Sequence, residues 1–124
     1  TLINELGLEK RVHMIGHVED MASFYNALDI FCLPSLQEGF PLTPLEAQAC
    51  NIRVVVSDVG GSKDTLCPMT GIAVPAGNVD ALAKSLLSML QYNETFSPRE
   101  FIKEHYNFAN KISIYNSLYH KVQK

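Results

Sequence analysis

The sequence predicts an α/β fold in which helices pack on a doubly wound, Rossmann-like parallel sheet. Short apolar runs alternate with segments of helical pattern along the chain, and this order is typical of α/β domains. The runs are apolar throughout instead of alternating with polar residues, as expected of strands that are covered on both faces. Parallel strands also need crossover connections, and the helical segments supply them.

Four apolar runs are the expected strands. They cover residues 12–15 (VHMI), 29–34 (DIFCLP), 53–58 (RVVVSD) and 71–75 (GIAVP). A glycine, a proline or an aspartate borders each run, and these residues favour the turns at which strands end.

Helical patterns connect the runs. Residues 20–28 fit the first crossover, and residues 62–66 form a short third one. Residues 43–50 lie between them, with Thr43 as the expected N-cap and Pro44 at the first helical position, where a missing N–H costs nothing. The clearest helix begins at Asn78 as N-cap, and its expected buried face consists of Val79, Leu82, Ala83, Leu86, Leu87 and Leu90.

Helical patterns also occupy both ends of the sequence. One helix is expected to begin near Ser97 and Pro98, and the last one has an apolar stripe of Phe108, Ile112, Tyr115, Tyr119 and Val122. The first ten residues are helical in pattern, with an expected inward face of Leu2, Ile3 and Leu6. Because the chain begins inside this helix and without methionine, we expect a piece of a longer protein whose first strands lie upstream.

Composition indicates one compact domain over residues 1–124. Hydrophobic residues make up 47% of the 124 residues and charged residues 19%, and no repeat or interdomain linker is evident. The net charge of -3 and the lack of a basic cluster argue against a nucleic-acid partner. No run approaches the roughly 20 apolar residues of a membrane span, and no signal peptide is recognisable, so a cytoplasmic protein is expected. Cys32, Cys50 and Cys67 are expected to be reduced core thiols.

Three loops at the expected strand ends are candidate ligand contacts. They cover residues 16–18, 35–43 and 58–63, and ligands of open parallel sheets bind beyond the carboxyl ends of the strands. The second loop leads into a helix N-terminus, which favours an anion, and Gly39 permits a close approach of the backbone. These residues predict an anion or nucleotide site.

The stretch "PSLQEGFPLTPLEAQAC" resembles the E-x7-E signature of retaining glycosyltransferases of the GT-B fold, with Glu38 and Glu46 as its two acids. The segments before and after it also resemble this family in order, over nearly the whole chain. The resemblance implies a partial C-terminal, donor-binding domain, one half of a GT-B fold without its first strands. The implied activity is transfer of a sugar from a nucleotide-sugar to a glycan or lipid-linked acceptor, as in lipopolysaccharide or capsule synthesis.

The resemblance also implies roles for individual residues. Glu38 would stabilise the transferred sugar in the transition state, and Glu46 would bind the ribose hydroxyls of the nucleotide. Both tasks suit an ionised carboxylate, which accepts several hydrogen bonds and favours a neighbouring oxocarbenium-like sugar. The remaining implied contacts are the loop that faces the sugar and diphosphate, Gly39, Phe40, Pro41, Leu42 and Thr43, and the segment near the base, Gly16, His17 and Val18.

No cofactor or metal is implied besides the nucleotide-sugar substrate. The partner would be an N-terminal GT-B domain outside this chain, so the isolated fragment is expected to be nearly inactive. In the full-length protein a peripheral position at the inner face of the membrane is expected. Absent first strands would leave a slot between residues 12–15 and 29–34, to be closed by direct pairing of these runs or by self-association with a second copy.

Simpler structural roles remain open for the candidate residues. Glu46 three residues after Thr43 also matches a capping box. Independently of this, the simpler interpretation of Glu38 is a solvated loop charge. Gly60 and Gly61 match an ordinary strand-to-helix turn. His17 has the residue type of a general acid or base, yet histidines at strand ends often bind only backbone groups.

Two other functions remain open as well. A GT-B epimerase would alter a nucleotide-sugar without an acceptor, but its motif differs. A non-enzymatic, receiver-like nucleotide-binding domain would need an acidic cluster after an early strand, whereas Asp58 stands alone after its run.

Overall fold

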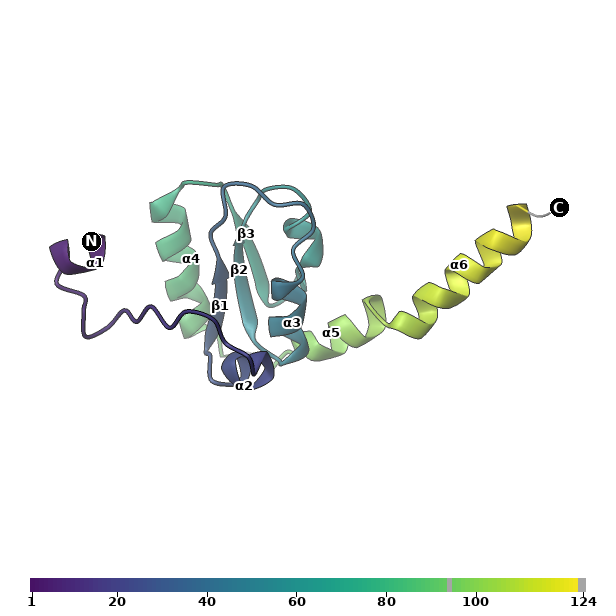
Figure 1. The fold of residues 1–124 in the computed structure, drawn as a ribbon, viewed down its shortest axis with the longest axis horizontal. Helices are drawn as coiled ribbons and strands as arrows, with labels where there is room; N and C mark the ends of the chain where they lie inside the picture. The colour runs from purple at the N-terminus through teal and green to yellow at the C-terminus, as the bar shows by residue number, and fades with distance from the viewer. Residues whose placement is uncertain (94, 123–124) are drawn as a thin grey trace.

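A three-stranded parallel sheet forms the centre of the fold. The computed structural model describes residues 1–93 and 95–122. The strands are β1 (Ile30–Leu33), β2 (Arg53–Ser57) and β3 (Gly71–Val74), in the order β1-β2-β3. Ile30 pairs with Arg53, and Val54 pairs with Gly71. All three strands therefore end at the same edge of the sheet, where the connecting loops gather (Figure 1).

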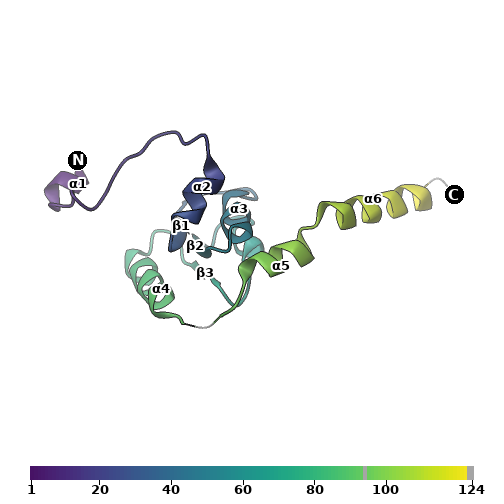
Figure 2. The same ribbon diagram turned by 90° about the horizontal axis from the view of Figure 1, so that it is seen from below.

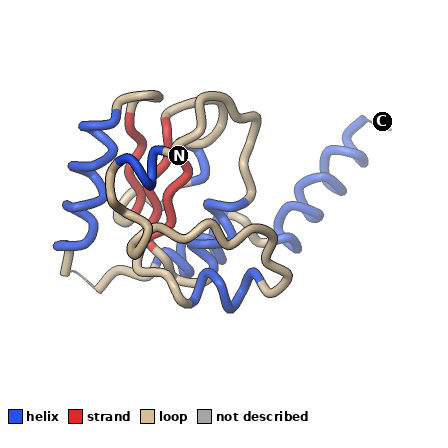
Figure 3. Tube along the Cα trace, turned by 60° about the vertical axis from the view of Figure 1, so that its left-hand side comes forward, coloured by secondary structure: helices blue, strands red, loops and turns tan. Residues whose placement is uncertain are grey.

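Helices cover both faces of this sheet. Their bounds are α1 (Leu2–Glu5), α2 (Met21–Asn26), α3 (Thr43–Ala49), α4 (Val79–Gln91), α5 (Pro98–His105) and α6 (Phe108–Val122), with a 3₁₀ turn η1 (Lys63–Thr65). Helix α4 lies on one face, and α2 and α3 lie on the other (Figure 2). The strands are enclosed between these two helical layers (Figure 3).

The central strand β2 supplies the middle of both core layers. Val54 and Val56 pack toward α2 and α3 with Tyr25 and Ala47, whereas Val55 packs toward α4. Successive side chains of a strand point to opposite faces, and all three valines are fully buried. The continuous apolar run that predicted a strand covered on both faces is thereby explained, and the predicted α/β parallel fold is confirmed.

The predicted strand over residues 12–15 is wrong. These residues form a loop between α1 and α2, and Met14 and Ile15 are 87% and 59% exposed. A strand is held by its ladder of hydrogen bonds, and residues 12–15 pair with none of the three strands of the described sheet. The hypothesis that this run pairs directly with residues 29–34 is therefore also wrong, while self-association with a second copy stays a prediction.

The start of α3 differs from the prediction by one residue. Leu42 is the N-cap and makes no side-chain cap, and Thr43 is the first helical residue. Pro44 is buried in the first turn, where a proline is tolerated. The capping box predicted for Thr43 and Glu46 is therefore absent, and the side chain of Glu46 is available for another role.

The predicted inward faces of two helices, α1 and α4, were wrong in part. In α4 the packed residues are Ala81, Leu82, Leu86 and Met89, while Val79, Leu87 and Leu90 are more than half exposed. The predicted and the observed faces have the same helical period and share Leu82 and Leu86, so the sequence pattern alone does not decide between them. Leu2 in α1 and Leu6 at its C-cap are exposed instead of facing inward. Helix α6, as the sequence predicts, is a helix with an apolar stripe; it projects from the sheet, and the stripe is exposed (Figure 1).

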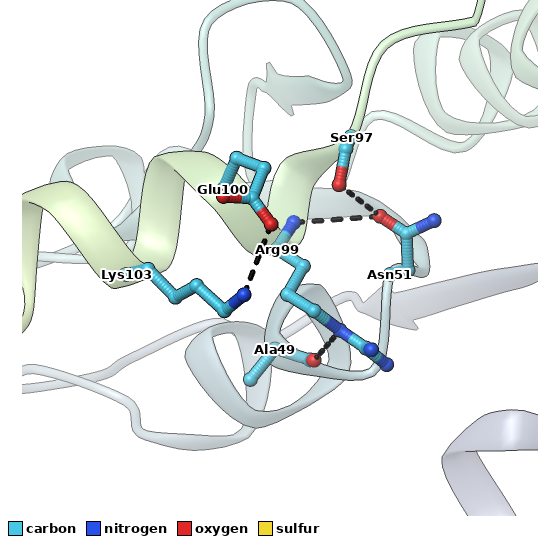
Figure 4. Close-up of polar contacts among 6 residues, drawn as sticks. All are labelled: Ala49, Asn51, Ser97, Arg99, Glu100 and Lys103. Carbon is cyan, nitrogen blue, oxygen red and sulfur yellow. Dashed lines mark hydrogen bonds and ion pairs between the residues drawn. The ribbon is translucent and has the colours of Figure 1, made fainter.

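Helix α5 is held against the end of α3 by polar contacts. The Arg99 side chain donates through Nε to the carbonyl of Ala49 at 2.8 Å. Ser97 donates to Oδ1 of Asn51 at 2.8 Å, and Asn51 has a positive φ of 68°. Figure 4 shows these contacts together with the exposed Glu100–Lys103 ion pair of α5. The helix predicted near Ser97 and Pro98 is confirmed.

The three cysteines are free, as expected, and Cys67 is fully buried. Burial raises the pKa of the Cys32 thiol, which disfavours its reactive thiolate form. Within the described residues, each helix lacks the length and apolar character needed to cross a membrane.

Candidate functional site

The loop with Glu38 rests on the turn formed by Gly60 and Gly61. The N–H of Gly61 donates to the carbonyl of Gly39 at 2.6 Å. Gly60 has a φ of +52°, and a Cβ built on it would lie 2.0 Å from the Glu38 carbonyl oxygen. Both facts require glycine at position 60, because an L side chain would be strained there and would collide with the loop. The double glycine is a strand-to-helix turn, as the simpler interpretation held, and it also supports the Glu38 loop.

Glu38 is half-buried and has a partner within its own loop. The hydroxyl of Ser35 donates to Glu38 Oε1 at 2.6 Å. Further along, Pro41 is buried, whereas Phe40 and Leu42 are 50% and 61% exposed. The loop thus has a packed side and an open side, and the simple picture of a fully solvated carboxylate does not describe Glu38.

A pocket of about 460 Å³ contains the second acid. Its lining residues are Ile15, Gly16, His17, Val18, Met21, Phe24, Thr43 and Glu46. The predicted base-binding segment, residues 16–18, and the predicted ribose-binding acid therefore face the same pocket. Residues 38–42 do not line this pocket, so the fold separates the first acid from it.

Glu46 is held by a residue outside the predicted site. The hydroxyl of Tyr25 donates to Glu46 Oε2 at 2.8 Å. Tyr25 is 1% exposed, and burial, followed by the hydrogen bond to Glu46, raises the pKa of its hydroxyl. The phenol therefore remains a protonated donor at neutral pH.

Three residues of α2 thus belong to the site, namely Met21, Phe24 and Tyr25. The sequence pattern predicts their segment only as a crossover helix. The available signal was a tyrosine within an apolar helical run, because a buried tyrosine usually needs a partner for its hydroxyl. The identity of that partner depends on how α2 packs beside α3.

The third loop contributes an exposed ion pair. Lys63 Nζ lies 3.8 Å from Asp58 Oδ2, and both side chains are largely exposed. Exposed pairs of this kind contribute little to stability. In the described part of the chain, no three His, Cys, Asp or Glu side chains gather as metal ligands; that no metal or cofactor is needed stays a prediction.

The chain is similar to known proteins in both sequence and structure. The family model described as "Glycosyl transferases group 1" matches residues 1–108. A lipopolysaccharide core biosynthesis mannosyltransferase, LpcC, of Rhizobium leguminosarum bv. viciae is 38% identical over 81 residues, which are 64% of this chain and 23% of that protein. The capsular polysaccharide biosynthesis glycosyltransferase CapM of Staphylococcus aureus is 36% identical over 80 residues, 64% of this chain and 21% of that protein.

A solved structure has the same fold. The sucrose-phosphate synthase of Thermosynechococcus elongatus matches with a TM-score of 0.81 and 31% identity, over 98% of this chain and 32% of that one. The chain spans about a quarter of the length of the curated relatives named above. The likeness therefore concerns one part of these larger proteins.

Proposed function

Because the chain belongs to the group 1 glycosyl transferases, we propose that residues 1–124 form the C-terminal, donor-binding part of a retaining GT-B glycosyltransferase. The substrate is a nucleotide-sugar, and the acceptor is a glycan or a lipid-linked sugar. A domain outside this chain would complete the reaction cleft. Since both curated relatives named above act in lipopolysaccharide or capsule synthesis, we assign the enzyme to a bacterial surface glycan, made in the cytoplasm or at the inner face of the membrane.

The two acids have different proposed roles. Glu46 accepts hydrogen bonds from the ribose hydroxyls, and residues 16–18 contact the base. Glu38 stabilises positive charge on the sugar as its bond to the diphosphate breaks, and main-chain groups of residues 39–42 face the sugar and diphosphate. The nucleoside diphosphate leaves, and the glycosyl group passes to an acceptor hydroxyl with its anomeric configuration kept.

One observation supports this proposal most: the pocket that joins Gly16, His17 and Val18 to Glu46. These residues come from segments about 30 positions apart in the sequence, and they meet without a strand at residues 12–15. The pocket has an apolar wall of Met21 and Phe24 beside one carboxylate. An apolar surface with a few polar groups is the composition expected of a site for a flat base and its ribose.

A Glu46→Gln variant of the complete enzyme tests the proposal. Glutamine can still accept the Tyr25 hydrogen bond, so the local structure is retained while the charge is lost. Hydrogen bonds to charged groups contribute about 1.5–3 kcal/mol, so the donor Kd should rise about 10- to 100-fold. Calorimetric titration with nucleoside diphosphates and nucleotide-sugars measures this change.

The matched control is Glu100→Gln. It removes the same charge from an exposed site on α5, and it should leave donor binding unchanged. An unaltered donor Kd in Glu46→Gln would contradict the proposed ribose contact. Product analysis in the same enzyme distinguishes transfer from epimerisation, because an epimerase would release an altered nucleotide-sugar without an acceptor.

A further inference from the structure

We propose that Tyr25 is a positioning residue of the donor site, whose hydroxyl holds the carboxylate of Glu46 in the orientation that the ribose requires. The inference rests on the proposed function, because it assumes that Glu46 binds the donor. It adds a residue from a different helix, α2, to the two acids of the α3 region.

The geometry gives Tyr25 a fixed position. Its ring is 1% exposed, and it packs edge-on against Phe31 at 5.6 Å and tilted against Phe24 at 5.8 Å between ring centroids. These contacts anchor the ring in the core on the α2 side of the sheet. The hydroxyl therefore presents its proton from a rigid site.

Glu46 has no such support of its own. It is an exposed residue of α3, and the side-chain cap that would have fixed it is absent. A free glutamate samples many rotamers, and ordering it on binding has an entropic cost. The bond to Tyr25 engages Oε2 at 2.8 Å, which leaves the other carboxylate oxygen with acceptor sites for a ligand.

The same hydrogen bond has a second interpretation, in which Glu46 only provides the partner that the buried Tyr25 hydroxyl needs. In that case Glu46 would serve Tyr25, and removing the hydroxyl would change stability without changing donor affinity. Donor affinity is therefore the measurement that distinguishes a role of Tyr25 in positioning Glu46 from a hydrogen bond that only stabilises the core.

A double-mutant cycle in the complete enzyme tests the inference. Tyr25→Phe keeps the ring and its contacts and deletes only the hydroxyl, and Glu46→Ala deletes the acceptor. The probe is whichever of UDP, GDP and ADP binds the wild-type enzyme most tightly, titrated by calorimetry. We expect Tyr25→Phe to raise Kd about three- to tenfold, as one net hydrogen bond of about 1 kcal/mol predicts, and to raise the KM for the donor with little change in kcat.

The control is Tyr106→Phe. Its hydroxyl also donates one hydrogen bond, to the carbonyl of Asp64 at 2.6 Å, but Tyr106 does not line the pocket. This variant likewise loses one hydroxyl hydrogen bond, and it should retain the wild-type Kd.

The second half of the cycle distinguishes the failures. In the Glu46→Ala background, Tyr25→Phe should leave Kd unchanged within about 1.5-fold, because the acceptor is already gone. If Tyr25→Phe weakens binding equally in both backgrounds, Tyr25 acts through packing and the inference is overturned. If Glu46→Ala weakens binding and Tyr25→Phe does not, the inference fails while the proposed function stands. If Glu46→Ala itself binds normally, the proposed function fails first.

Discussion

Replacing Gly60 by alanine tests whether the double-glycine turn positions the Glu38 loop. The new Cβ would lie 2.0 Å from the carbonyl oxygen of Glu38 and 2.8 Å from that of Gly39. Both atoms belong to backbone, which cannot rotate away as a flexible side chain can. The loop must therefore shift by roughly 1 Å, and a misplacement of about 1 Å near the reacting groups can cost about 100-fold in rate.

Gly77 provides a matched control for this substitution. It also has a positive φ, +72° against +52° for Gly60, but nothing lies within 4 Å of its Cβ position. Each alanine variant carries the cost of the left-handed conformation, roughly 1–2 kcal/mol, and only Gly60→Ala adds the collision. The difference between the two variants isolates the contact with the Glu38 loop.

The assay is turnover of the complete enzyme with saturating donor, combined with thermal unfolding of both variants. We expect Gly60→Ala to lower kcat about 100-fold, and Gly77→Ala to keep it within about twofold. If both variants keep the same kcat, the reacting geometry does not depend on the double glycine, and the assignment of Glu38 to the transition state loses its structural basis.

Two other substitutions have defined outcomes. Glu38→Ala should lower kcat by about 100-fold or more, in the range found for a lost transition-state contact. It should also destabilise the domain by about 0.5–1.5 kcal/mol, because the Ser35 hydrogen bond is lost. A variant with wild-type kcat would leave Glu38 with its Ser35 bond alone. Arg99→Ala should destabilise the domain by about 0.5–1.5 kcal/mol, since its side chain bonds the end of α3. Lys103→Ala on the same helix is the control, because it removes only the exposed ion pair. In chemical denaturation it should lower the free energy of unfolding by at most about 0.5 kcal/mol. Equal decreases in the two variants would show that the Arg99 contact is not what holds α5.

Local chemistry made much of the fold predictable from the sequence. Each strand of the sheet contains a short continuous apolar run, and the buried Val54, Val55 and Val56 of β2 show why such a run needs two covering layers. Asn78 was predictable as an N-cap because its side chain can accept the N–H of Ala81, which it does at 2.9 Å. These predictions depend on neighbours within about four positions.

The failures depend on partners far away in the chain. Residues 12–15 have the composition of a strand, but pairing partners decide whether a strand forms. The stripes of α4 overlap, and the choice between them is made by Val55 and Val74 on the sheet. The same limit applies to the site: the acid types were visible in the sequence, whereas the Tyr25–Glu46 bond joins residues that are 21 positions apart.

The two acids depend on different supports, and this separation has a measurable consequence. Glu46 is held by Tyr25 of α2, and the Glu38 loop is held by the turn that follows β2, through the bond from Gly61 to Gly39. Since the two supports share no contact residue among those bonds, perturbing one should not alter the other. Tyr25→Phe should therefore change donor affinity, Gly60→Ala should change turnover, and the free-energy effects of the combined variant should add within about 0.5 kcal/mol. Strong coupling would mean instead that the two acids move together as one unit, with residues 39–45 transmitting the shift between them.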